Sequence, residues 1–283
     1  MPTPAITASL PALETPTLES PPEPTPEPPQ ELDLEELIQM SGIAYYGDLA
    51  LCQMPPEQAS AFIDTIEAEM DRLKSIEISW TDEEVTYLGY AALFDAGNGI
   101  PEMLFIGGGL TSAYADRITA EGCWFEWPWK GTIWGYADGT VFSEDPIVDL
   151  SSLGYADPYH HLDNDDSIYI RDDNALQIRY SNPSAIWDGV FPFVDGRVSS
   201  TPTETNAIYE PGYGGKGSGY MVNEQELSFE EYLAWTAEKP GYTPIAGFEA
   251  EEGGPGAYCW GLSPMDDVLK FLYRIADAGE SHT

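Results

Sequence analysis

The hydrophobic and polar positions of this chain follow a helical period near both ends and a strand-like pattern in between. From Pro56 to about Ile76, apolar residues recur at helical spacing behind the start signal Pro55-Pro56-Glu57. This apolar stripe consists of Ala59, Phe62, Ile63, Ile66, Met70 and Leu73. A shorter amphipathic segment covers 34–40. The pattern predicts two helices whose apolar stripes pack in the core.

Two further helices are predicted near the C-terminus. Ser228 and Glu231 have the spacing of a capping box, in which each side chain pairs with the backbone amide of the other, and they open a helix that runs to about Ala237. Ser263-Pro264 opens the last helix, and Gly279 is its stop signal. Its buried face is predicted to consist of Val268, Leu269, Leu272, Ile275 and Ala276.

Between about Thr86 and Val222, short apolar or aromatic runs alternate with Gly, Asp and Asn. The candidate strands are Met103–Ile106, Thr132–Tyr136, Ser167–Arg171, Ala175–Tyr180, Val190–Val194 and Ala207–Glu210. Hairpin turns are predicted at 172–174, at Asp138-Gly139 and at Asp195-Gly196. The fold class is therefore α+β, with N-terminal helices, a central antiparallel β-sheet and C-terminal helices.

The first 33 residues are unlike the rest of the chain. Ten of the 24 prolines lie within residues 1–30, and no aromatic residue precedes Tyr45. Proline stiffens the chain, and the low apolar content cannot offset the entropy of ordering it. We therefore predict a disordered Pro/Glu/Thr-rich tether over 1–33 and a single acidic domain over 34–283.

Such tethers are typical of domains held off a wall or membrane, so we expect an extracellular, surface-attached setting. The given chain begins without the positive and apolar regions of a secretory signal. The surface interpretation therefore requires that a signal or anchor segment was removed. A cytoplasmic or phage-associated protein is the alternative.

Charge narrows the range of partners. The chain has 49 acidic and 11 basic residues and a formal charge of −38. The first 33 residues hold six acids and no base, so −32 belongs to the predicted domain. This sign repels nucleic acid and anionic lipid, and it favours calcium and cationic peptides. No apolar run reaches the roughly 18 residues of a membrane span.

The three cysteines, Cys52, Cys123 and Cys259, show no metal-ligand spacing. One disulfide with one free thiol and three reduced thiols are both compatible with the sequence, depending on the compartment.

Two segments resemble a known group of proteins. Residues 87–109 read YLGYAALFDAGNGIPEMLFIGGG, and residues 220–232 read YMVNEQELSFEEY. They are similar to segments of uncharacterised secreted or lipid-anchored surface proteins of anaerobic gut Firmicutes, which carry a YxLYDxDGDGxPELL-like motif. The resemblance covers about 35 of the 283 residues. It implies a cell-surface setting and no known activity.

The motif contains a candidate calcium loop. Calcium prefers six to eight oxygen ligands, and glycines permit the sharp turn that brings them together. Asp95, Asn98, the carbonyl of Ile100 and Glu102 are the candidate ligands. The usual second aspartate is missing, however. The favoured alternative is a plain turn from helix to strand at Asn98-Gly99, with Glu102 accepting loop amides.

An aromatic cluster is the candidate ligand platform. Trp127, Trp129, Trp134 and Tyr136 lie close together in the sequence and could stack on a glycan or peptide. Core packing is the favoured alternative, because aromatic stripes are more often core than site. Glu126 within this cluster is the candidate acid of a glycan hydrolase. A second cation candidate, 160–166, is interpreted as a solvated acidic loop.

No catalytic set is complete in this sequence. We therefore interpret the chain as a non-enzymatic, surface-tethered domain that binds an external ligand such as a glycan or peptide, with calcium as a candidate stabiliser. A glycan-active hydrolase that uses two carboxylates and an aromatic platform is the first alternative. A cytoplasmic or phage-associated structural domain is the second.

Overall fold

The structure is a computed structural model that describes residues 34–48, 53–75, 84–112, 123–125, 130–144, 148–149, 159–160, 167–182, 185–209, 219–250 and 257–280. The chain divides into two units, Met1–Glu31 and Leu32–Thr283. Every described residue belongs to the second unit, and the predicted tether 1–33 lies outside the described part.

The four helices of the described part are α1 (Leu34–Ser41), α2 (Pro56–Lys74), α3 (Phe229–Ala237) and α4 (Met265–Glu280). All four were predicted. The capping box of α3 is confirmed: Ser228 Oγ accepts the N–H of Glu231 at 3.3 Å, and Glu231 Oε2 accepts the N–H of Ser228 at 2.8 Å. None of these helices is long and apolar enough to cross a membrane.

The first sheet has six strands and is antiparallel except for the pairing of β1 with β2. Its order is β1-β2-β3-β5-β6, with β18 also paired to β2. The strands are β1 (Tyr45–Tyr46), β2 (Val85–Asp95), β3 (Pro101–Thr111), β5 (Lys130–Ala137), β6 (Thr140–Glu144) and β18 (Ser263–Pro264).

The second sheet is antiparallel and has ten strands in the order β15-β14-β13-β11-β10-β9-β16-β17-β4, with β12 paired to β11. The strands are β4 (Cys123–Phe125), β9 (Ser167–Arg171), β10 (Ala175–Asn182), β11 (Ala185–Val194), β12 (Arg197–Val198), β13 (Glu204–Tyr209), β14 (Tyr220–Val222), β15 (Gln225–Glu226), β16 (Tyr242–Ala250) and β17 (Ala257–Trp260). Pairing of β17 with β4 sets the backbone of Cys259 opposite that of Cys123. A separate pair consists of β7 (Val148–Asp149) and β8 (Tyr159–His160).

The α+β class is confirmed, but the strands form two large sheets where one central sheet was predicted. One hydrophobic core, the inter-sheet core, joins Phe94, Leu104 and Ile133 of the first sheet to Ile178 and Phe191 of the second.

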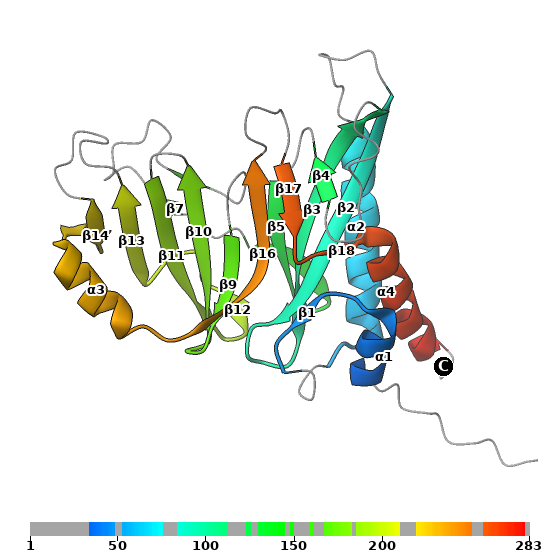
Figure 1. The fold of residues 1–283 in the computed structure, drawn as a ribbon. Helices are drawn as coiled ribbons and strands as arrows, with labels where there is room; N and C mark the ends of the chain where they lie inside the picture. The colour runs from blue at the N-terminus through cyan, green and yellow to red at the C-terminus, as the bar shows by residue number, and fades with distance from the viewer. Residues whose placement is uncertain are drawn as a thin grey trace, which may run out of the picture. The chain divides into compact units, whose positions relative to one another are not determined.

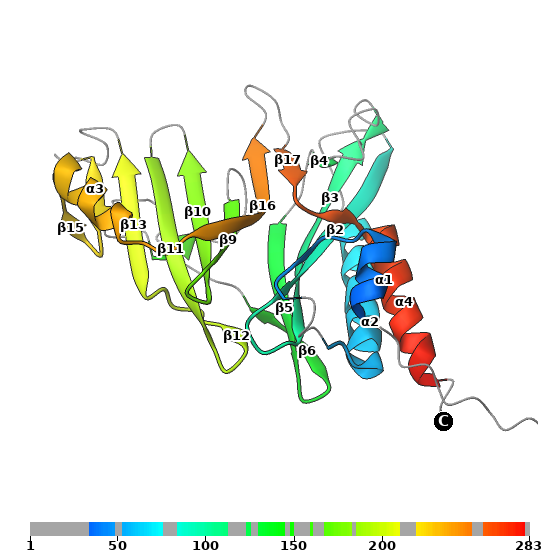
Figure 2. The same cartoon turned by 60° about the horizontal axis from the view of Figure 1, so that its bottom comes forward.

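A second core, the helix-side core, joins the opposite face of the first sheet to the helices. Ala91, Leu93 and Met103 of the sheet pack there with Phe62 of α2 and Leu272 of α4. Figures 1 and 2 show α1, α2 and α4 together on this side of the first sheet. The first sheet is therefore covered on both faces.

The strand β2 was not predicted, and the turn after it was expected to follow a helix. That expectation is wrong, because β2 and β3 form one long hairpin that pairs Val85 with Thr111 and Asp95 with Pro101. Side chains of β2 enter the inter-sheet core and the helix-side core in alternation. A strand buried on both faces reads as a continuous apolar run and lacks the alternation that reveals a half-exposed strand.

The predicted turns are confirmed. Asp138-Gly139 and Asp195-Gly196 each join two paired strands with both residues at positive φ, as a two-residue hairpin requires. Residues 172–174 join β9 to β10. The hairpin of β14 and β15 was missed, because its turn residues Asn223 and Glu224 include no glycine.

The close approach of α2 to β3 depends on Gly107. A Cβ atom at this position would lie 2.4 Å from Leu73 Cδ1 and 2.9 Å from the ring of Phe105. Leu73 is almost fully buried. The glycine therefore provides the space that Leu73 fills in the helix-side core.

We predict that Gly107→Ala lowers the free energy of unfolding by about 1–3 kcal/mol, because the added methyl overpacks the contact with α2. In the double variant Gly107→Ala/Leu73→Ala, the two losses should sum to more than the measured loss, since the second change removes the clash. Urea denaturation of the four proteins measures this coupling. Strictly additive losses would contradict the proposed contact.

Candidate functional site

The loop predicted to bind calcium is the turn of the β2–β3 hairpin. Asp95 Oδ1 accepts three backbone N–H groups, from Gly97 at 2.8 Å, Asn98 at 3.1 Å and Gly99 at 2.9 Å. Asn98 Oδ1 accepts the N–H of Ile100 at 2.9 Å. The side-chain oxygens of the first two candidate ligands therefore hold the turn itself.

The same turn contacts the second sheet. Asn98 Nδ2 donates to the carbonyl of Gly196 at 3.4 Å, in the turn between β11 and β12. Ile100 is partly exposed at 36 %. Within the described residues, no group of three or more His, Cys, Asp or Glu side chains is placed to hold a metal ion. A turn accounts for these contacts, but the expectation that Glu102 accepts the loop amides is wrong, because Asp95 accepts them. Nothing here adds support to the calcium hypothesis.

We predict that Asp95→Ala lowers the free energy of unfolding by about 1–3 kcal/mol, because three loop amides lose their acceptor. Asp95→Asn keeps an acceptor oxygen and should cost less. Wild-type melting temperatures in millimolar calcium and in chelator should agree within about a degree, since only a bound ion would stabilise the native state. A larger rise in calcium that Asp95→Ala abolishes would instead establish a calcium site.

The fourth candidate ligand, Glu102, forms a buried acid pair with Glu144 of β6. Glu102 is 3 % exposed and Glu144 is 7 % exposed. Both lie on the face of the first sheet that meets the second sheet, and Glu144 Oε2 accepts the N–H of Val198 at 2.9 Å. No described group bonds either oxygen of Glu102 if both carboxyls are ionised.

A proton on Glu102 resolves this arrangement. Burial, followed by the charge of Glu144 and a hydrogen bond to it, raises the pKa of Glu102 to about 10. Burial also raises the pKa of Glu144, against the opposing effects of the Val198 amide, the bond to Glu102 and the charge of Arg197. Glu102 is thus the proton donor and Glu144 the acceptor at neutral pH. The pair connects the two sheets.

We predict that Glu102→Gln stabilises the protein by about 1–3 kcal/mol near pH 8. The folded pKa of Glu102 lies above its ordinary value of 4.5, so its contribution to stability is complete below about pH 4.5 and is lost as pH rises toward about 10. Glutamine keeps a donor for Glu144 without this loss. The gain should shrink toward pH 5 in denaturation curves, whereas exposed Glu226→Gln should change little. A gain independent of pH would contradict the protonated state.

Of the four aromatic candidates for a ligand platform, two lie in the described part of the chain. Trp134 is 6 % exposed and stacks on Phe105 with ring centroids 4.6 Å apart. Tyr136 is half-buried against the same helix-side core. Trp127 and Trp129 lie outside the described residues, as do Glu126 and residues 161–166. Trp134 and Tyr136 therefore pack in or against the helix-side core, as the core-packing alternative predicts.

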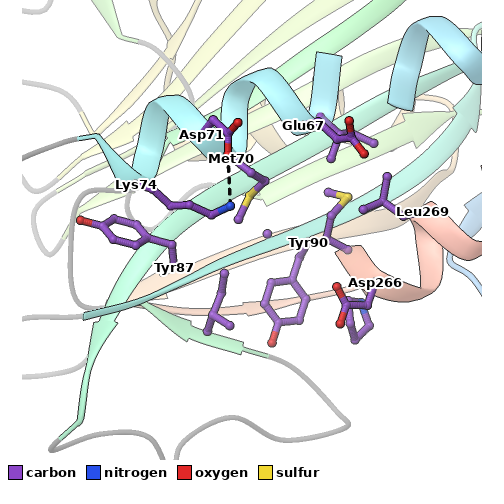
Figure 3. A pocket seen from close by; sticks show the side chains of 13 residues that line it. Glu67, Met70, Asp71, Lys74, Tyr87, Tyr90, Asp266 and Leu269 are labelled. Carbon is purple, nitrogen blue, oxygen red and sulfur yellow. Dashed lines mark hydrogen bonds and ion pairs between the residues drawn. The ribbon is translucent and has the colours of Figure 1, made fainter. Parts of the chain in front are cut away.

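A pocket that the sequence did not reveal lies between α2, α4 and β2 (Figure 3). It has a volume of about 650 Å³. The lining residues come from three distant segments of the chain. They are Ile66, Glu67, Met70, Asp71, Lys74, Tyr87, Leu88, Gly89, Tyr90, Pro264, Met265, Asp266 and Leu269. We call this the helix–strand pocket.

The lining combines apolar and acidic groups. Met70, Met265 and Tyr87 give the pocket an adaptable apolar surface, whereas the ring of Tyr90 belongs to the inter-sheet core on the other face of β2. Three carboxylates, Glu67, Asp71 and Asp266, accompany a single base, Lys74. Lys74 Nζ lies 3.2 Å from Asp71 Oδ1, so this base is already paired (Figure 3).

One of the carboxylates is held in place. Glu67 Oε1 accepts the hydroxyl of Tyr273 on α4 at 2.7 Å. This bond connects α2 to α4 beside the pocket. The pocket could not be recognised from the sequence, because residues 66–74, 87–90 and 264–269 meet only when the two helices pack on β2.

Comparison with known proteins found no matching family model, no matching curated protein and no matching solved structure.

Proposed function

We propose that the acidic unit is a non-enzymatic binding domain, and that its helix–strand pocket receives a positively charged amphipathic segment of an external peptide. The pocket is the observation on which this proposal rests. A cavity of about 650 Å³ is of the size that typically binds a small ligand or a few side chains.

The chemistry of the lining supports this ligand class. Met70, Met265 and Leu269 offer apolar contact to aliphatic or aromatic side chains. Glu67 and Asp266 add negative charge, and Asp71 is already paired with Lys74. An apolar ligand that also carries a cation can use both features.

The charge of the whole chain supports the same sign of ligand. A formal charge of −38 attracts cations toward the surface and raises their association rate at low salt. An anionic ligand would approach against this field. The pocket therefore supplies a local reason, and the net charge a long-range reason, for a cationic partner.

The setting is part of the proposal. The Pro/Glu/Thr-rich composition of 1–33 and the two segments that resemble surface proteins support a domain displayed outside the cell. Detection of the native protein on intact cells with an antibody against residues 34–283 tests this. Its recovery only after cell lysis would favour the cytoplasmic alternative.

The hydrolase alternative has no specific observation in its favour. The acid pair of Glu102 and Glu144 is buried at the inter-sheet core and is not among the residues that line the helix–strand pocket. Two carboxyls that share a proton lie closer together than the roughly 5 Å or more that separates the catalytic carboxylates of glycosidases. We therefore favour binding over hydrolysis.

The test is a fluorescence anisotropy titration with a labelled short peptide of alternating leucine and lysine. We predict saturable binding by the wild-type chain. The double variant Glu67→Gln/Asp266→Asn should bind about tenfold more weakly, since it removes two charges of the lining. The wild-type affinity should also fall as salt rises.

The matched control is Glu57→Gln/Glu230→Gln, which removes two exposed acids outside the pocket and changes the net charge equally. This control should bind like the wild type. Equal weakening by both double variants would show attraction to overall charge alone and would overturn the pocket assignment. Equal binding of a leucine–glutamate peptide would overturn the proposed ligand class.

A further inference from the structure

A second surface of the molecule is rich in aromatic rings and lies on the far side of the ten-stranded sheet from the inter-sheet core. In β9, β10 and β11, Ile168, Ile178 and Trp187 point into that core. Their chain neighbours Tyr169, Arg179 and Asp188 therefore lie on the opposite face, because side chains alternate along a strand. We call this the outer face.

Two aromatic groups stand on the outer face. Tyr242 of β16 is 51 % exposed and meets the ring of Tyr169 edge to face, with centroids 5.0 Å apart. On the side of β14, Tyr220 stacks on Tyr232 of α3 at 5.0 Å, and Tyr232 lies 5.6 Å from Trp235. Helix α3 thus borders the face at β14 (Figures 1 and 2).

A fixed polar group lies beside the ring of Tyr169, which itself contacts Tyr242. The guanidinium of Arg179 donates to both oxygens of Asp188, at 2.8 Å and 3.2 Å, and lies 5.6 Å from the centre of the Tyr169 ring. Its side chain is 32 % exposed, whereas that of Asp188 is 4 % exposed. Arginine has five N–H donors, and this ion pair uses two of them.

The bases of this face are held in ion pairs. Arg171 pairs with Asp173 and Glu204, and Lys239 also pairs with Glu204. Together with Arg179 and Asp188, three bases meet three acids. Asp172, whose carboxylate lies beside Gly241, adds a fourth acid. The acids named here therefore exceed the bases by one, whereas the chain as a whole has 49 acids and 11 bases.

We propose that the outer face binds a neutral polysaccharide, with a sugar ring stacked on Tyr242 and its hydroxyls bonded by Arg179. The C–H face of a pyranose is apolar and fits a flat aromatic ring, while its rim of hydroxyls needs planar, fixed donors and acceptors. Such a ligand carries no charge, so the ion-paired groups of this face neither repel it nor require a counter-charge. This site is separate from the helix–strand pocket and does not depend on it.

The experiment is native affinity electrophoresis of the full chain in gels that contain xylan, galactomannan, mixed-linkage β-glucan or starch, with anionic polygalacturonate as the contrast. The charge of −38 drives the protein into each gel. We expect at least one neutral polysaccharide to retard the wild type. Retardation by polygalacturonate alone, or by none of the polymers, would overturn the proposal.

Variants locate the site. Tyr242→Ala should weaken the apparent affinity about tenfold or more, the loss typical of one central aromatic contact. Tyr242→Trp keeps a stacking surface and should retain binding, which separates stacking from a general structural effect. Arg179→Lys should weaken binding, because lysine lacks the planar donor set.

Two controls complete the design. Tyr273→Ala removes another exposed tyrosine, 43 % exposed against 51 % for Tyr242, from α4 and should migrate like the wild type. The pocket variant Glu67→Gln/Asp266→Asn should also be retarded normally, so failure of the pocket proposal and failure of this one are distinguishable. Undiminished retardation of a folded Tyr242→Ala variant would place the site elsewhere and contradict the assignment.

Discussion

The structure depends on burial of the first sheet on both faces. The β2–β3 hairpin pairs eleven residues of each strand, and every residue of β3 is buried. One face belongs to the inter-sheet core and the other to the helix-side core. This hairpin therefore positions the second sheet on one side and the helices on the other. Its turn end holds Asp95 and Glu102, and residues 87–90 of β2 line the helix–strand pocket.

Several local features follow from this position. The hairpin turn has to be compact where it meets the second sheet, and Asp95 achieves this by accepting three loop amides. Glu102 is buried because β3 is buried along its length, so its carboxyl is kept neutral and bonded to Glu144. The helix–strand pocket lies between α2, α4 and β2. Glu67, Asp71 and Asp266 give its lining an excess of negative charge, whereas the bases of the outer face are held in ion pairs.

The sequence predicted those elements whose signals are local. The helices followed from apolar spacing and caps, such as Ser228 with Glu231, and the short hairpins followed from Asp-Gly turns.

The β2 strand could not be recognised, because burial on both faces removes alternation. Division of the strands into two sheets depends on contacts between distant segments. For the same reason the pocket could not be predicted, because its lining comes from three segments. The pairing of Arg179 with Asp188 likewise depends on two neighbouring strands. Aromatic content suggested a platform, but Trp134 is packed in the core, and Tyr242 is one of the exposed rings in the described part of the chain.

Hydrogen–deuterium exchange with and without the leucine–lysine peptide tests the binding account most directly. The account predicts that the peptide slows amide exchange in 66–74, 87–90 and 264–269, the segments that line the helix–strand pocket. Exchange in α3 and across the outer face should stay unchanged. Protection spread evenly over the acidic surface, or confined to segments outside the pocket, would contradict the account.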